Sequence, residues 1–144
     1  MIKNFDGTQI KPGSVNIRLD SLYKIGSKKK ICPDNITVQE CCISLPYSLK
    51  PGDYVLGKSM EQFTLPKNYC IYHTHRTSTM RIGILIVGGY GDPGYKGEIY
   101  FGIKNIGENT VVLKRAMSLS KVIFIAVEGN SLPLISRFQG GKLL

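Results

Sequence analysis

Short segments rich in β-branched and aromatic residues recur along this chain, and they constrain its fold more than any other feature. Turn signals built on proline, glycine and asparagine, such as Lys50-Pro51-Gly52, separate them. The segments are residues 15–19, 36–44, 53–58, 69–73, 97–104, 110–113 and 121–128. Short strands separated by such turn signals predict an all-β sandwich or barrel. Residues 77–82 predict one short helical turn, with Thr77 or Ser78 as its cap.

Length and composition predict a single folded unit. The chain has 144 residues, of which 42% are hydrophobic and 20% are charged, as in ordinary globular domains. We expect a domain over residues 1–129 and a tail over residues 130–144. Apolar runs stay far below the roughly 18 to 20 residues of a spanning helix, and the first residues lack the apolar core of a secretion signal. We therefore expect a cytoplasmic protein (host cytoplasm for a viral source) without a membrane partner.

The charge balance favours an anionic partner. Lysine and arginine outnumber aspartate and glutamate by 19 to 10, which gives a formal net charge of +9. Nucleotide phosphates, an acidic surface or nucleic acid would each suit this charge, but no nucleic-acid-binding motif supports the last. The four cysteines form no C-x-x-C pair, and His73 and His75 have no third ligand nearby in sequence. We predict no metal ion held by protein ligands.

A polar segment at the start of the predicted helical turn suits a phosphate. Arg76 and Arg81 flank the hydroxyl groups of Thr77 and Ser78. Free backbone N–H groups and guanidinium forks are the donors that match phosphate oxygens. The alternative interpretation is a polar loop that only caps a helix.

A glycine-rich stretch follows at residues 88–97. Its backbone N–H and C=O groups could read a planar base, because they offer a fixed pattern of donors and acceptors. Asp92 supplies one carboxylate, and Tyr95 could stack on a sugar or a ring. A glycine-rich hairpin without a ligand is the alternative.

The tail carries Arg137, Phe138 and Gln139 before two glycines. An arginine on a phosphate and a ring over a base could close such a tail over a bound nucleotide. A frayed C-terminus is the alternative.

Together these segments resemble the trimeric dUTPase and dCTP deaminase superfamily over residues 10–141. Five stretches carry the resemblance, in the family's order: Ile10-Lys11-Pro12-Gly13-Ser14-Val15-Asn16-Ile17-Arg18-Leu19 (family I-x-P-x-S-V-D-L-R-L), Leu49-Lys50-Pro51-Gly52-Asp53-Tyr54-Val55-Leu56 (L-x-P-G-E-F-V-L), Arg76-Thr77-Ser78-Thr79-Met80-Arg81-Ile82-Gly83 (R-S-S-L-A-R-L-G), Asp92-Pro93-Gly94-Tyr95-Lys96-Gly97-Glu98-Ile99 (D-x-G-Y-x-G-E-I) and Ser136-Arg137-Phe138-Gln139-Gly140 (K-Y-Q-G-Q).

The resemblance implies a distorted, jelly-roll-like β-barrel that assembles as a homotrimer, with the tail as a lid. It implies that Asp92 activates a water, that Tyr95 packs under the deoxyribose, and that Mg²⁺ is held mainly by the substrate's triphosphate. The other implied substrate-binding residues are Arg76, Thr77, Ser78, Arg81, Gly88, Gly89, Tyr90, Gly91, Lys121, Arg137, Phe138 and Gln139.

Three departures from the family pattern separate the functional hypotheses. The catalytic glutamate of the deaminase branch is replaced by Gly102, which cannot transfer a proton. The opening-strand aspartate is Asn16, and a phosphate-contacting glutamine is Lys121. The leading hypothesis is therefore a dUTPase-like diphosphatase that converts dUTP to dUMP and pyrophosphate. The alternatives are a non-catalytic nucleotide-binding or assembly trimer and, disfavoured by Gly102, a dCTP deaminase.

Overall fold

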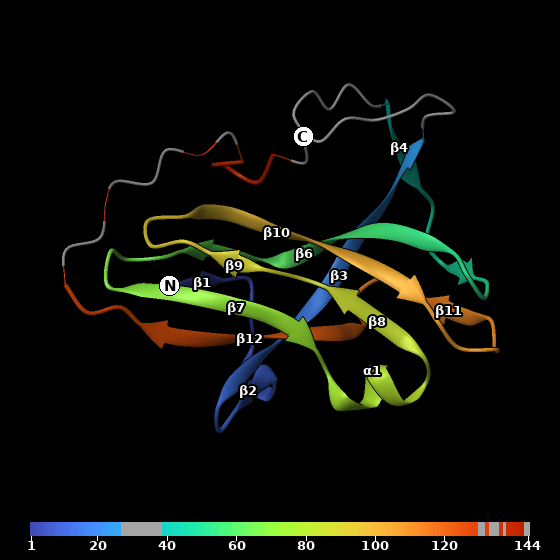
Figure 1. The fold of residues 1–144 in the computed structure, drawn as a ribbon, viewed down its shortest axis with the longest axis horizontal. Helices are drawn as coiled ribbons and strands as arrows, with labels where there is room; N and C mark the ends of the chain where they lie inside the picture. Colours follow the sequence, from blue (N-terminus) through green and yellow to red (C-terminus); the bar gives the residue numbers. More distant parts are fainter. Residues whose placement is uncertain (27–38, 130–131, 133–135, 137, 143–144) are drawn as a thin grey trace.

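The computed structural model describes residues 1–26, 39–129, 132, 136 and 138–142, and β-strands dominate it (Figure 1). The strands are β1 (Ile2–Lys3), β2 (Ile10–Lys11), β3 (Ser14–Gly26), β4 (Gln39–Ile43), β5 (Tyr47–Leu49), β6 (Tyr54–Thr64), β7 (Tyr69–His75), β8 (Ile84–Val87), β9 (Tyr90–Gly91), β10 (Lys96–Asn105), β11 (Val111–Leu113) and β12 (Ser118–Ala126). The helical elements of the described ranges are the 3-10 turn η1 (Gly7–Gln9) and the helix α1 (Thr77–Arg81). The all-β prediction is confirmed. None of the described helices is long and apolar enough to cross a membrane.

Strand β3 joins the two halves of the main sheet. Its residues 15–18 pair with β12, and its residues 19–26 pair with β6 and β4. The sheet runs in the order β8-β10-β6-β3-β12-β7-β9, and it curls into a half-open barrel because β3 passes from one layer to the other (Figure 1). A small second sheet pairs β11 with β5.

The core is clearest along β6, where buried and more exposed residues alternate. In β6, every second side chain from Val55 to Phe63 is buried, as expected where one face of a strand packs inward. Phe101 and Ile103 of β10 approach this face. The full set of buried apolar residues is Ile17, Leu19, Leu22, Leu49, Val55, Phe63, Leu65, Ile71, Ile84, Ile86, Phe101, Ile103, Leu113, Leu119 and Val122. One position on the buried face of β6 is charged: Glu61.

The predicted helical turn exists, but its cap differs from the prediction. Helix α1 begins at Thr77, and the N-cap residue is Arg76, whose side chain makes no capping hydrogen bond. The prediction that Thr77 or Ser78 caps the turn is therefore wrong, because both residues lie inside the helix. Their hydroxyl groups are not used as caps. In the predicted strand at 36–44, residues 36–38 lie outside the described residues, and β4 begins at Gln39.

Candidate functional site

A cationic pocket forms where β2, β3, β12 and the start of α1 meet. It is a cavity of about 320 Å³. Its lining residues are Lys11, Ser14, Asn16, Arg76, Thr77, Ser78 and Lys121. We call this set the cationic pocket. It brings together four residues that the sequence analysis predicted for phosphate binding, and it adds Lys11 and Ser14, which that analysis did not assign to a site.

Backbone pairing fixes the side chains of the cationic pocket. Lys11 lies opposite Ser14 in the β2–β3 hairpin, and Lys121 of β12 lies opposite Asn16 of β3. Side chains of directly opposed residues share one face of a sheet at about 5 Å between Cβ atoms. Arg76 donates from Nη1 to the carbonyl of Ser118 at 2.7 Å, which leaves its remaining guanidinium donors available. The lining combines three cationic side chains with hydroxyl groups.

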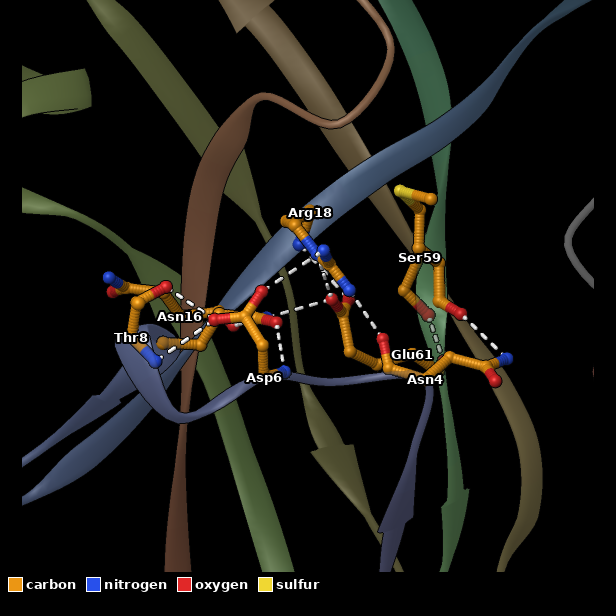
Figure 2. Close-up of polar contacts among 9 residues, drawn as sticks. Asn4, Asp6, Thr8, Asn16, Arg18, Ser59 and Glu61 are labelled. Carbon is orange, nitrogen blue, oxygen red and sulfur yellow. Dashed lines mark hydrogen bonds and ion pairs between the residues drawn. The ribbon is translucent and has the colours of Figure 1, made fainter.

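A buried carboxylate anchors the segment that leads into this pocket (Figure 2). Glu61 is 0% exposed, and its carboxylate accepts hydrogen bonds from Gln9 Nε2 at 2.8 Å and from Arg18 Nε at 2.8 Å and N at 3.0 Å. Gln9 Nε2 also donates to the carbonyl of Asn16 at 2.7 Å. Gln9 in turn closes a capping box with Asp6 around η1. The position of the β2–β3 hairpin therefore depends on Glu61.

A second cavity, of about 310 Å³, lies at the glycine-rich hairpin. We call it the hairpin pocket. Its described lining residues are Ile71, Tyr90, Gly91, Asp92, Tyr95, Ile99, Tyr100, Ser136, Phe138 and Lys142. The hydroxyl of Tyr95 donates to the carbonyl of Glu98, and burial, with the Glu98 charge as the lesser cause, raises the pKa of Tyr95. Asp92 and Tyr95 thus share a cavity, whereas Arg76 lines the other one.

The predicted base-reading glycines pack closely against β7. A Cβ atom at Gly88 would lie 2.4 Å from the carbonyl oxygen of His73, and one at Gly91 would lie 2.7 Å from Ile71. His73 N donates to the carbonyl of Gly89 at 2.9 Å. Glycine at 88 permits the close approach of two backbones, and glycine at 91 leaves room for the Ile71 side chain. These contacts use part of the hydrogen-bonding capacity that we predicted for a base.

His73 itself is a packed core histidine. It is 2% exposed, its Nε2 lies 2.8 Å from Ser120 Oγ, and its ring contacts Phe101 edge-on. Its Nδ1 has no hydrogen-bond partner among the described residues. Burial lowers the pKa of His73 to about 4. The described residues as a whole contain no cluster of three or more His, Cys, Asp or Glu side chains that could hold a metal ion.

The described part of the tail lies on the hairpin of its own chain. Gln139 accepts from Lys96 N at 3.0 Å and donates to the carbonyl of Gly94 at 3.0 Å, and Gly140 N donates to the carbonyl of Lys96 at 2.8 Å. A Cβ at Gly97 would lie 2.3 Å from Gly141 N, so the two backbones are in direct contact. Phe138 reaches the hairpin pocket. The predicted arginine of the tail, at position 137, lies outside the described residues.

Arg81 and Gly102 line neither the cationic pocket nor the hairpin pocket. Arg81 lines a shallow surface groove with Ile82 and Ile106, apart from Arg76. Gly102 lies opposite Leu56 and Val87 in the sheet, and a Cβ there would be 2.6 Å from the hydroxyl oxygen of Tyr54. Tyr54 therefore occupies the space that a side chain at 102 would enter. Burial raises the pKa of Tyr54.

The chain is similar in sequence to curated proteins and in fold to solved structures. The chain is 30% identical to a dCTP deaminase, dUMP-forming, of Corynebacterium diphtheriae over 98% of this chain and 81% of the relative. It is 29% identical to the enzyme of that name from Mycobacterium tuberculosis over 90% and 74% of the two chains. The 2′-deoxycytidine 5′-triphosphate deaminase of Agrobacterium tumefaciens superimposes with a TM-score of 0.70 at 21% identity, covering 88% of this chain but 44% of that one. A dUTPase of EIAV gives 0.52 at 24% identity, covering 81% of this chain and 97% of that one.

These relatives correct the leading functional hypothesis. The prediction of a dUTPase-like diphosphatase acting on dUTP is wrong, because the curated relatives that match nearly the whole chain are named dCTP deaminases. Glycine at position 102 does not exclude the deaminase branch, because the likeness to that branch extends over nearly the whole chain. The predicted superfamily and fold are confirmed. The family model described as dCTP deaminase-like matches residues 1–127, so this chain belongs to the dCTP deaminase-like family.

Proposed function

We propose that this chain takes dCTP as its nucleotide and acts on it as an enzyme of its family, with the triphosphate in the cationic pocket. The observation that carries the proposal is the convergence of Lys11, Arg76 and Lys121 on one cavity beside the hydroxyl groups of Thr77 and Ser78. Arginine offers forked donors that match phosphate oxygens, and lysine adds point charges. The relatives supply the identity of the nucleotide, because their names state dCTP as the substrate.

The base and sugar would lie in the hairpin pocket of a neighbouring copy. No described residue lines both the cationic pocket and the hairpin pocket. One chain therefore does not present Arg76 and Asp92 to the same ligand within one cavity. The homotrimer implied by the family resemblance stays a prediction, and it would supply the missing half of each site. A cytoplasmic location likewise stays a prediction.

The relatives' name, dUMP-forming, defines the chemistry to test. Converting dCTP to dUMP consumes two waters and releases ammonia and pyrophosphate. Asp92 is our proposed base for the water that attacks phosphorus, because it lines the hairpin pocket with Tyr95. The deamination step needs a proton-transfer group at a position other than 102, since glycine offers none.

Binding of dCTP without deamination is a second candidate, and one observation favours it. Tyr54 stands against Gly102, so the space for an acidic side chain at that position is filled. The cationic pocket is independent of this change, because neither Tyr54 nor Gly102 lines it. A chain of this kind would retain affinity for the nucleotide and lose the release of ammonia.

The test measures binding and turnover on the same preparation. We would titrate the protein with dCTP and with dUTP by calorimetry, and then assay ammonia and pyrophosphate. We expect dCTP to bind, and Arg76→Ala to weaken it at least tenfold, or about 1.4 kcal/mol. Lys67→Gln is the matched control, because Lys67 is exposed and outside both pockets.

The outcomes separate the two candidates. Ammonia and pyrophosphate from dCTP, with pyrophosphate lost in Asp92→Asn while dCTP still binds, would establish the enzyme. Binding of dCTP with no product would select the second candidate. Absence of dCTP binding by the folded protein, or an equal loss in Lys67→Gln and Arg76→Ala, would refute the assignment of the cationic pocket.

A further inference from the structure

The charge of the cationic pocket conflicts with the family expectation of a metal-assisted triphosphate. The family pattern has an aspartate at the position of Asn16 and a glutamine at the position of Lys121. Each replacement raises the formal charge of the pocket by one unit. The two positions are directly opposed in neighbouring strands, so both changes act on the same part of the pocket.

The cations of this pocket are not neutralised within the described part of the chain. The ion pairs of that part join Arg18 to Asp6 and Glu61, and Arg115 to Asp20. Lys11 Nζ donates to the carbonyl of Thr8 at 3.0 Å, and no ion pair involving Lys121 is formed there. Their positive charge is therefore available to a ligand.

The pocket offers no ligand of the kind that Mg²⁺ prefers. Magnesium in nucleotide sites is held by one or two carboxylates together with substrate phosphates. Among the described lining residues none is aspartate or glutamate, and Asn16, which stands where the carboxylate would be, is neutral. Three cationic side chains would also repel a divalent cation. Mg²⁺ therefore does not fit this residue set, which offers it no anionic ligand and places three positive charges beside it.

We infer that the cationic pocket binds the polyphosphate group without a divalent cation, with Lys11, Arg76 and Lys121 supplying the positive charge that the metal would bring. This inference rests on the proposed function, because it concerns the same pocket. A polyphosphate carries several negative charges and many acceptor oxygens. Lysine and arginine donors satisfy both needs directly.

The experiment compares affinities with and without metal. We would titrate the full-length chain with dCTP, and separately with pyrophosphate, in EDTA and in excess Mg²⁺. The expected dissociation constants agree within about threefold between the two conditions, well below a tenfold change. The affinity in EDTA should fall steeply as salt is raised, since the interaction is one of exposed charges.

A double variant restores the family residues and serves as the second arm. Asn16→Asp combined with Lys121→Gln should bind dCTP at least about tenfold more weakly in EDTA and recover part of that loss in Mg²⁺. Lys67→Gln, the same lysine change outside the pocket, should behave as the unchanged chain. Circular dichroism and a thermal scan check that the double variant folds. If it does not fold, the titrations of the unchanged chain in EDTA and in Mg²⁺ alone test the inference.

Each result bears on the inference. If dCTP binds in Mg²⁺ but more than about threefold more weakly in EDTA, the inference is overturned and the proposed function stands. If neither dCTP nor pyrophosphate binds in either condition, both fail. Equal affinities in the two conditions, with metal dependence appearing in the double variant, would establish metal-free binding.

Discussion

Removing the buried carboxylate of Glu61 should destabilise the whole domain. The side chain of Glu61 is 0% exposed, and it accepts three hydrogen bonds, two of them from Arg18, whose side chain is 22% exposed. Breaking one partner of a buried ion pair costs about 3–5 kcal/mol. Arg18 keeps its contacts with Asp6 and with the carbonyl of Asn4, which reduces the loss. We expect Glu61→Ala to lower the free energy of unfolding by about 4 kcal/mol and Glu61→Gln by about 2 kcal/mol.

Urea denaturation at neutral pH and matched protein concentration measures this loss. Glu128→Gln is the control: the chemical change is the same, but Glu128 is exposed, so the expected effect stays within about 0.5 kcal/mol. Because the capping box depends on Gln9, amide hydrogen exchange over residues 4–11 should also accelerate in the Glu61 variants. Equal stability of Glu61→Gln and Glu128→Gln would refute the stabilising role of the Glu61 carboxylate.

Three further predictions follow from burial and close contacts. Because burial lowers the pKa of His73 to about 4, below pH 6.5 the unfolded chain binds a proton that the folded chain does not. The free energy of unfolding should therefore fall by about 3 kcal/mol between pH 6.5 and 4, and His73→Leu should flatten this dependence in urea titrations. Gly97→Ala should release the tail, because a Cβ there meets Gly141, and hydrogen exchange over residues 138–142 should speed at least about tenfold. Gly57→Ala places a Cβ 2.9 to 3.0 Å from three core side chains. This overpacking should lower the free energy of unfolding by about 1–3 kcal/mol, which a drop in Tm measures.

The sequence pattern predicted most long strands because their signals are local. Residues 97–104 and 121–128 show β-branched and aromatic runs, and β10 and β12 lie there with shifted ends. The short strand β9 was not predicted, since its two residues lie among glycines and are too few to show an alternating pattern, and it forms by pairing with β7. Packing against β7, rather than local preference, decides that element.

The sequence pattern does not predict contacts between residues that lie far apart in the sequence. Glu61 lies 52 positions from Gln9 and 43 from Arg18, and no local spacing links them. The motif around Arg76 and the hairpin around Asp92 line separate cavities in the single chain, and their meeting in one site between subunits stays a prediction. Which residues share a cavity depends on how β3 and β12 register, and that register is a property of the folded sheet.

The central position of β3 has a consequence for the synthesis of the chain. On one side, β3 pairs with β6, which is made well before β12. On the other, it pairs with β12, which ends at Ala126 and is the last strand of the described residues to leave the ribosome. An emerging chain therefore holds β3 with an open edge until nearly the whole domain has been made, and open edges invite pairing with other chains. Chaperone engagement during translation should accordingly persist until β12 emerges.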